Sequence, residues 1–536
     1  MQELKFEELS IKQKLGMVMA GILRMIEPNE VYGTYEENFE FVLDQIRNHA
    51  LGAVWIPQSS SVRDAALQRI NEVADYPILI ITDAENGLKD RLIGRHNAIG
   101  MANSEELAYT FGKVTAITAR QMGYNVICDP LLDMPKQWGA CGKNCRALGS
   151  NKETVTKLAL AEARGIHDAG VLTVAKHYPG GNSAECIDSH MAEACADQTR
   201  EELLEENLYP YLALMKEGLL DGIMTEHKRF PQIDEKYPAS LSKKVIDIIR
   251  EQGFEGFAIT DALDMMGIKA KFGDTRAKGM CIEAGNEFIL PWFSAKKAYR
   301  DLCDCYEEGL ISDARLDVAV KRILAAQHKV MVMQQNAKFD EVTPEDLEAF
   351  ERINTDSIYA RTDAGVPVAI DPNGKHFFAV LVRNETDVSA DGKVSVDTFT
   401  NGWHFPARIQ KKLLENFPNS TVRAIRQFPT PAENQAILHA SLGYEQVIFL
   451  TFAEAPAYAG SDALTQRITA LIKAMQITSR ISTVMHFGNP YVLEDIAHVS
   501  RVLIGPMAAN SIDAGIEVLA GKREAKGVLT YDVNFR

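Results

Sequence analysis

The chain has 536 residues, 46% of them hydrophobic and 24% charged, which describes a globular protein with a large core in two or three domains. Its 57 basic and 73 acidic residues give a net charge of −16, which argues against nucleic acid and anionic membrane as partners. The eight cysteines contain no CxxC pair, so we interpret them as thiols rather than as a disulfide framework or a metal site.

No run approaches eighteen apolar residues, and the polar, acidic first segment differs from a secretory signal, so we expect no membrane span and a cytoplasmic location. There is no HExxH, no GxGxxG after a strand and no Walker lysine loop. We therefore expect neither a metal nor an organic cofactor.

Residues 1–340 alternate short apolar runs with longer amphipathic stretches, a pattern typical of βα units around a parallel sheet. Eight strands are predicted, and eight is the number that closes a (β/α)₈ barrel. They are expected at residues 16–20, 53–56, 78–82, 126–132, 172–175, 222–225, 257–260 and 287–290.

Polar residues follow several of these strands on the carboxyl side. In a barrel the carboxyl ends of all strands meet around one mouth. The sequence therefore predicts that residues far apart along the chain converge on one site, namely Asp83, Glu85, Arg91, Lys176, His177, Glu226, His227 and Asp261.

A second domain is predicted after a linker over residues 341–374, which holds a polar helical segment and the turn-rich Asp371-Pro-Asn-Gly374. Helices are expected near 407–414 and 464–475. Five strands with intervening helices favour a three-layer α/β sandwich over residues 375–536. The strands are expected at 377–382, 421–425, 446–452, 483–487 and 501–504.

The densest polar segment is the loop from Lys176 to His190, which ends in Asp188-Ser-His190. In an extended segment, residues two apart point the same way, so Asp188 can hold one ring nitrogen of His190 and leave the other free. Such a histidine is a usable general acid and base near neutral pH. The alternative for a DxH alone is a solvated polar loop.

Asp261 ends a predicted buried strand, where an unpaired carboxylate needs a partner or a function. As a nucleophile it would form a covalent glycosyl intermediate while His190 supplies and later withdraws the proton. Two alternatives stay open. Asp261 or Asp264 could cap a helix, and Glu226 is a rival carboxylate.

Basic side chains near the same strand ends are donors for hydroxyl or anionic groups. Together with Asp83 they favour a hydroxyl-rich ligand such as a sugar. These donors are Lys176, His177, Arg91 and Arg146.

Taken together, these motifs resemble glycoside hydrolase family 3, and within it the β-N-acetylglucosaminidase branch. The resemblance covers nearly the whole chain. It rests on KHYPG followed by DSH between Lys176 and His190, on MTEHKRFPQIDEKYPASLS from Met224, on TDALDM from Thr260 and on HFGNPY from His486.

The resemblance implies a retaining mechanism with Asp261 as nucleophile, His190 as acid/base and Asp188 as its dyad partner. The implied substrate is a carbohydrate, a terminal β-linked N-acetylglucosamine on a glycan or muropeptide fragment. It also implies that Asp83 and Arg91, in a segment similar to DxEGGxVxR, bind sugar hydroxyls together with Arg146, Lys176 and His177.

Three positions depart from the family pattern, at Gly181-Asn182, at Asn86 and at Glu226. They bear on the identity of the substrate. The alternatives are a β-N-acetylglucosaminide phosphorylase, because a histidine repels phosphate less than a glutamate does, a β-glucosidase of the same family, and a degenerate, non-catalytic sugar-binding or regulatory module.

Overall fold

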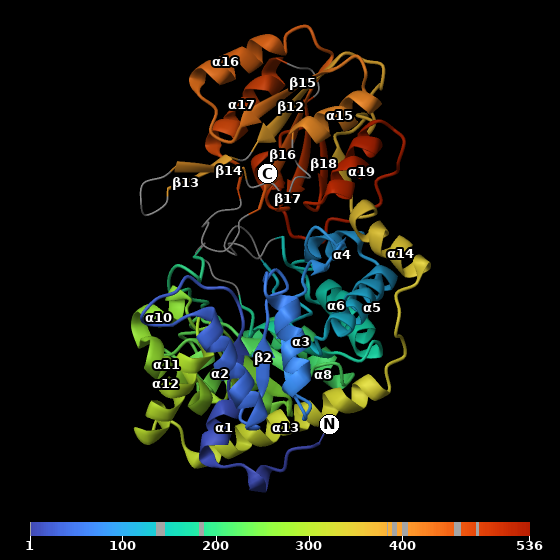
Figure 1. The fold of residues 1–536 in the computed structure, drawn as a ribbon. Coiled ribbons are helices and arrows are strands. Elements are labelled where there is room, and N and C mark those ends of the chain that lie inside the picture. Colours follow the sequence, from blue (N-terminus) through green and yellow to red (C-terminus); the bar gives the residue numbers. More distant parts are fainter. Residues whose placement is uncertain are drawn as a thin grey trace. The chain divides into compact units, whose positions relative to one another are not determined.

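The computed structural model in Figure 1 describes residues 2–135, 145–181, 187–382, 384–388, 394–398, 406–454, 463–478 and 482–535. The chain divides into two compact units. The first comprises Met1–Leu92, Ser104–Ala140 and Ser150–Phe350, and the second comprises Ile93–Asn103, Cys141–Gly149 and Glu351–Arg536.

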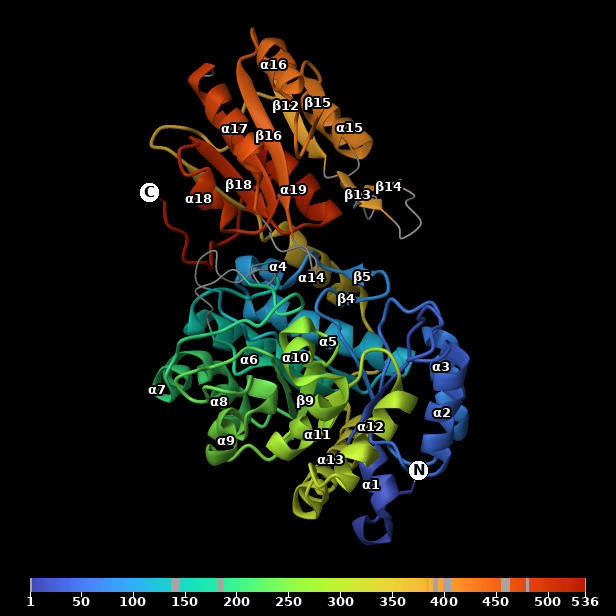
Figure 2. The same cartoon turned by 90° about the vertical axis from the view of Figure 1, so that its left-hand side faces the viewer.

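The first unit is built on an eight-stranded parallel sheet in the order β1-β2-β3-β6-β7-β8-β9-β10. A parallel bridge between Met19 and Ile289 joins its last strand to its first, so the sheet closes into the predicted (β/α)₈ barrel (Figure 2). The strands are β1 Ala20–Ile22, β2 Ala53–Trp55, β3 Leu79–Thr82, β6 Val126–Ile127, β7 Leu172–Tyr178, β8 Gly222–Thr225, β9 Phe257–Ala262 and β10 Phe288–Leu290.

Amphipathic helices surround the barrel. In α9, Lys243–Glu251, the buried side chains are Val245, Ile246, Ile248 and Ile249, an apolar stripe that the helical period brings to one face. The others are α1 Ile11–Met17, α2 Tyr35–Arg47, α3 Arg63–Val73, α5 Glu105–Met122, α6 Lys152–Asp168, α7 Arg200–Glu202, α8 Tyr209–Lys216, α10 Met266–Phe272, α11 Asp274–Ala284, α12 Ala295–Glu307 and α13 Asp313–Gln335.

The first predicted strand, over residues 16–20, is wrong in position. Residues 16 and 17 belong to α1, and β1 begins only at Ala20. The side chain of Ser10 accepts a hydrogen bond from the N–H of Gln13, and the Gln13 side chain accepts one from the N–H of Ser10. This capping box marks the start of a helix. The apolar residues at the end of that helix were assigned to a strand because the prediction did not use the capping box.

The second unit contains a six-stranded sheet in the order β11-β18-β17-β16-β12-β15, in which β11 alone is antiparallel to its neighbour. With its helices it forms the predicted α/β sandwich (Figure 1). Its elements are α4 His96–Ala102, β11 Tyr359–Thr362, β12 His376–Val382, β13 Asn384–Val388, β14 Val394–Thr398, α15 Pro406–Asn416, β15 Thr421–Arg426, α16 Pro431–Ala440, β16 Gln446–Ala453, α17 Gln466–Thr478, β17 Ser482–Gly488, α18 Val492–Asp495, β18 Arg501–Gly505 and α19 Ala509–Leu519.

The segment predicted as a linker, residues 341–374, holds two regular elements. The helix α14, Pro344–Thr355, spans the boundary between the two units, and β11 pairs with β18 at the edge of the second sheet. The short sequence Tyr-Ala-Arg-Thr of β11 is only half-buried, so it lacks the apolar run by which the other strands are recognised. Among the helices that the structure describes, none combines the length and apolarity that crossing a bilayer requires.

A buried ion pair stabilises the amino end of β8. The side chain of Asp221 is 2% exposed, lies 2.7 Å from His167 Nε2 and also pairs with Lys329. Burial raises the pKa of Asp221, but His167 and Lys329 outweigh it and hold the pKa at about 2. The carboxylate therefore stabilises the folded state at pH values above its unfolded pKa, and this contribution is lost as the pH falls toward 2.

We expect Asp221→Asn to lower the free energy of unfolding at pH 7 by about 2–3 kcal/mol, since a pKa held about two units below its ordinary value stores that amount. Urea unfolding of both proteins at pH 7 and pH 3 measures this. The difference between wild type and variant should shrink to about half at pH 3. An unchanged difference would contradict the ion-pair account.

Candidate active site

The carboxyl ends of four barrel strands carry polar residues that the sequence singles out. Asp83 follows β3, Lys176 and His177 belong to the last residues of β7, Glu226 follows β8, and Asp261 lies in β9. Because all these strands are parallel members of one closed barrel, their ends meet around one mouth.

Lys176 is a buried cation held between two carboxylates. Its side chain is 1% exposed, and its Nζ lies 2.5 Å from Asp83 Oδ1 and 2.5 Å from Glu85 Oε1. The side chain of Asp83 is 49% exposed, whereas that of Glu85 is 10% exposed. Asp83 is thus accessible to a ligand, and Glu85, which the sequence placed at the mouth without a stated role, neutralises Lys176 from the inside.

His177 forms a second pairing at the mouth. Its Nδ1 lies 2.6 Å from Asp133 Oδ2, and both side chains are buried. A carboxylate on Nδ1 orients the ring and leaves Nε2 to contact a ligand. Asp133 lies in the loop after β6 and was not predicted, because only its place after a strand distinguishes it in the sequence.

Asp188 and His190 form a hydrogen-bonded pair in the loop after β7. His190 Nδ1 lies 2.7 Å from Asp188 Oδ1, and the same oxygen accepts the backbone N–H of His190 at 2.9 Å. The side chain of His190 is 30% exposed. Residues 182–186 of this loop lie outside the described residues.

The loop that carries this pair is bonded to the start of α10, directly after β9. The N–H of Met266 donates to the carbonyl of His190 at 3.1 Å, and the N–H of Gly267 donates to the carbonyl of Ser189 at 3.0 Å. A Cβ on Gly267 would lie 2.8 Å from the Ser189 oxygen, so this approach requires glycine. These bonds bring His190 to the strand end that bears Asp261.

The carboxyl of Asp261 is held in its ionised form. Burial raises its pKa, but the charges of His177, His227 and His190 outweigh burial and bring the pKa below the ordinary value. Its Oδ1 also accepts the N–H of Ala262 at 2.7 Å. An ionised carboxylate is the state that a nucleophile requires.

The helix-cap alternative for Asp261 and Asp264 is wrong. The helix α10 begins after Met265, and no side chain caps its first turn. Instead, Asp264 has a buried Oδ1 without a hydrogen-bond partner, and burial raises its pKa. It lines a small open pocket together with the aromatic side chains of Tyr32, Trp292 and Phe293.

Glu226 is engaged by a neighbouring cation. Its side chain is 6% exposed, and its Oε2 lies 3.1 Å from Lys228 Nζ. Because this carboxylate is held in a buried ion pair, Glu226 is a weaker candidate for the nucleophile than Asp261.

His227 supports the end of β9. Its Nε2 lies 3.0 Å from the carbonyl oxygen of Ala262, which can only accept, so Nε2 carries a proton, and its Nδ1 lies 2.8 Å from Ser240 Oγ. Burial lowers the pKa of His227, although the charge of Asp261 raises it in part. The contact fixes the residue next to Asp261.

The two predicted arginines, Arg91 and Arg146, come from segments other than the barrel strands. Arg91, in β5 Arg91–Leu92, which pairs with β4 Gly87–Leu88, donates from Nη1 to Thr118 Oγ1 on α5 at 2.7 Å. Arg146 belongs to the second unit. Sugar binding by either residue stays a prediction.

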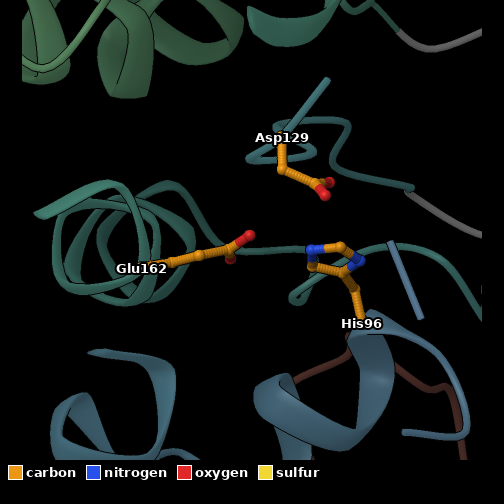
Figure 3. Close-up of side chains that lie close together, drawn as sticks. All are labelled: His96, Asp129 and Glu162. Atoms are coloured by element: carbon orange, nitrogen blue, oxygen red, sulfur yellow. The ribbon is translucent and has the colours of Figure 1, made fainter. Parts of the chain in front are cut away.

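Two further carboxylates are buried in the first unit. Asp129 follows β6 and Glu162 belongs to α6, and their carboxylate oxygens lie within 4.8 Å of one another (Figure 3). His96, also drawn in Figure 3, belongs to the second unit. Two carboxylates are fewer than the three or four protein ligands of a zinc site, and we assign no metal to the described part of the barrel.

The contrast between Asp83 and Glu85 gives a direct prediction. Glu85→Gln should lower the free energy of unfolding by about 3 kcal/mol, because it weakens the neutralisation of a buried lysine. Asp83→Asn should cost less stability but raise KM, because its carboxylate is accessible to the ligand. Thermal unfolding and kinetics of both variants measure this, and equal losses of stability would refute the division of roles.

A closed barrel with an ionised aspartate and a carboxylate-bound histidine at its mouth is an arrangement that can support nucleophilic and acid–base chemistry. Residues 9–326 match the glycosyl hydrolase family 3 N terminal domain, and the chain belongs to this family. A beta-hexosaminidase of Idiomarina loihiensis is 30% identical over 246 residues, which are 42% of this chain and 72% of that protein. Beta-hexosaminidase A of Pseudoalteromonas piscicida is 26% identical over 308 residues, and the chain spans about half of its length.

Solved structures show the same fold over nearly the whole chain. A family 3 beta-N-acetylglucosaminidase from a Paenibacillus species has a TM-score of 0.79 at 24% identity, covering 98% of this chain and 100% of that one. A beta-glucoside phosphorylase has a TM-score of 0.80 at 22% identity, covering 98% and 94%. At these identities the likeness concerns the fold alone.

Proposed function

We propose that this protein is a retaining β-N-acetylhexosaminidase that removes terminal β-linked N-acetylglucosamine. The observation that carries the proposal is the loop with Asp188 and His190, which is bonded to the start of α10 beside the ionised Asp261. The beta-hexosaminidases among the relatives support the choice of sugar.

In the first step, a carboxylate oxygen of Asp261 attacks the anomeric carbon as the glycosidic bond breaks. His190, protonated on both ring nitrogens, donates its Nε2 proton to the departing oxygen, while Nδ1 stays bonded to Asp188. The negative charge of Asp188 stabilises the imidazolium before the transfer. The products are a glycosyl ester on Asp261 and a free aglycone alcohol.

In the second step, the neutral His190 accepts a proton from water, and the water oxygen attacks the anomeric carbon. The ester bond to Asp261 breaks and its carboxylate is restored. His190 ends the cycle protonated, as it began, and two inversions at the anomeric carbon give net retention. No metal or organic cofactor takes part.

The sugar is held by groups around the same mouth. Asp83 offers an accessible carboxylate for hydroxyl groups, Lys176 polarises it, and His177 presents Nε2 because Asp133 occupies Nδ1. Arg91 and Arg146 are proposed as further contacts from the sequence motif alone. The pocket beside Asp264 adds aromatic surface of the kind that packs on sugar rings.

A phosphorylase is the second candidate, because a neutral histidine does not repel an incoming phosphate. The mouth, however, contains the ionised carboxylate of Asp261, which disfavours the approach of a dianion. We therefore favour water as the acceptor. Product analysis in phosphate buffer decides, since a sugar phosphate as the main product would replace hydrolysis with phosphorolysis.

Replacing Asp261 and replacing His190 should lower the activity to different extents, depending on the leaving group of the substrate. Asp261→Ala should lower kcat by about 10⁴-fold or more on every substrate, because no glycosyl ester can form. His190→Ala should lower kcat/KM by about 10²-fold or more for poor leaving groups and far less for activated aryl glycosides, which leave without protonation. Steady-state kinetics on a series of aryl and alkyl β-N-acetylglucosaminides measures both.

The matching control is Glu226→Gln, which removes the rival carboxylate while keeping its shape. Activity that survives Asp261→Ala and disappears in Glu226→Gln would transfer the nucleophile to Glu226. The identity of the sugar is tested separately, by comparing the turnover of aryl N-acetylglucosaminide, glucoside and xyloside by the wild-type protein. Wild-type protein that binds N-acetylglucosamine but turns over none of these three substrates would be a binding module instead of an enzyme.

A further inference from the structure

Lys228 is a buried cation that reaches the loop carrying the acid/base pair. It follows β8 by three residues and its side chain is 7% exposed. Its Nζ donates to the carbonyl oxygens of Gly180 and Gly181, at 3.2 Å and 2.7 Å. These glycines begin the chain segment that leads from the end of β7 to Asp188.

Glu226 supplies the negative charge that permits this burial. Its Oε1 and Oε2 lie 3.2 Å and 3.1 Å from Lys228 Nζ. An ammonium group has three protons to donate, and the two carboxylate oxygens and the two carbonyl oxygens surround it with acceptors. Hydrogen bonds from a charged donor are stronger than those between neutral groups, so the contact holds the two carbonyls firmly.

The two glycines fit this position because of their backbone and their surroundings. Their φ angles are +82° and +88°, a region that residues with a side chain rarely adopt. A Cβ on Gly181 would lie 2.7 Å from the Phe230 ring, and one on Gly180 would lie 3.3 Å from Asn207. The start of the segment is therefore enclosed as well as hydrogen-bonded.

The end of this loop is held by a second pair of hydrogen bonds. They run from the N–H groups of Met266 and Gly267 to the carbonyls of His190 and Ser189. The first pair of bonds comes from the residues after β8 and the second from those after β9. Both run to backbone carbonyls, and the Asp188–His190 pair lies at the second, beside the start of α10.

We propose that Lys228, charge-balanced by Glu226, is a positioning residue for proton transfer through His190. It holds the carbonyls of Gly180 and Gly181, where the loop that carries the pair begins, so that the histidine meets the departing oxygen in one geometry. The inference rests on the proposed function and deepens it, since it assigns a role in the glycosidase reaction to Lys228 and to Glu226, which the sequence marks only as a departure from the family pattern.

The test is a double variant, Glu226→Gln with Lys228→Met, which removes both charges and leaves neither partner buried alone. We expect kcat/KM to fall by about 30–100-fold for an alkyl or disaccharide N-acetylglucosaminide, the loss that follows a displacement of about 1 Å. For a dinitrophenyl glycoside, which needs no protonation, we expect less than about a threefold loss. In a His190→Ala background the double variant should add no further loss on the poor leaving group.

The matched control is Lys14→Met with Asp317→Asn, a partly buried lysine–aspartate pair between α1 and α13 with a 2.8 Å contact. It should change stability without changing the ratio of the two substrates. Equal losses on both substrates, or a loss that multiplies with that of His190→Ala, would overturn the positioning role. If the double variant does not fold, Lys228→Arg, which keeps the charge but changes the donor geometry, replaces it and is expected to give the same selective loss.

The measurements distinguish a failure of the proposed glycosidase function from a failure of the proposed role of Lys228. Wild-type protein without turnover of either glycoside would overturn the proposed function. Wild-type turnover with the expected leaving-group effect in His190→Ala, but none in the double variant, would retain the function and reject the role of Lys228.

Discussion

The site depends on a backbone contact between two loops that are distant in sequence. The loop after β7 is joined to the start of α10 by the amides of Met266 and Gly267, and this contact sets His190, the proposed acid/base, beside the strand that bears Asp261. The remaining features serve these two residues. A nucleophile and a proton donor must act on opposite sides of one bond, so neither is useful without a fixed distance to the other.

Charge pairing sets the protonation states around that contact. The buried Lys176 is balanced by Asp83 and Glu85, and Lys228 by Glu226. With these cations neutralised, Asp261 keeps its low pKa mainly through the surrounding histidines, although its burial alone would raise it. The proposed reaction thus combines an aspartate held in its ionised form with a histidine that gives up and regains one proton in each cycle.

Much of the fold could be predicted from the sequence, because a strand buried on both faces is a continuous apolar run. Seven of the eight barrel strands lie where such runs predicted them. The exception, around residues 16–20, was misread because the Ser10–Gln13 capping box starts a helix there. The edge strand β11 was missed for the opposite reason, since its half-buried sequence lacks an apolar run.

The candidate site was predictable where a motif or a strand end marks it, as at Asp188, His190 and Asp261. The partners that complete it were not, because a pairing is a property of three-dimensional distance. Asp133 lies 44 positions from the His177 that it binds, and nothing in the sequence links Lys228 to the carbonyls of two glycines. The residues that carry chemistry were thus easier to predict than those that orient them.

The central claim, that Asp261 forms a covalent bond to the sugar within reach of His190, can be tested by trapping. A fluorinated N-acetylglucosaminyl fluoride forms the ester quickly and loses it slowly, so the intact protein should gain the mass of one sugar. Peptide mapping should then place that mass on the peptide with Asp261. A label on Glu226, or turnover of natural substrate without any trapped ester, would contradict the account.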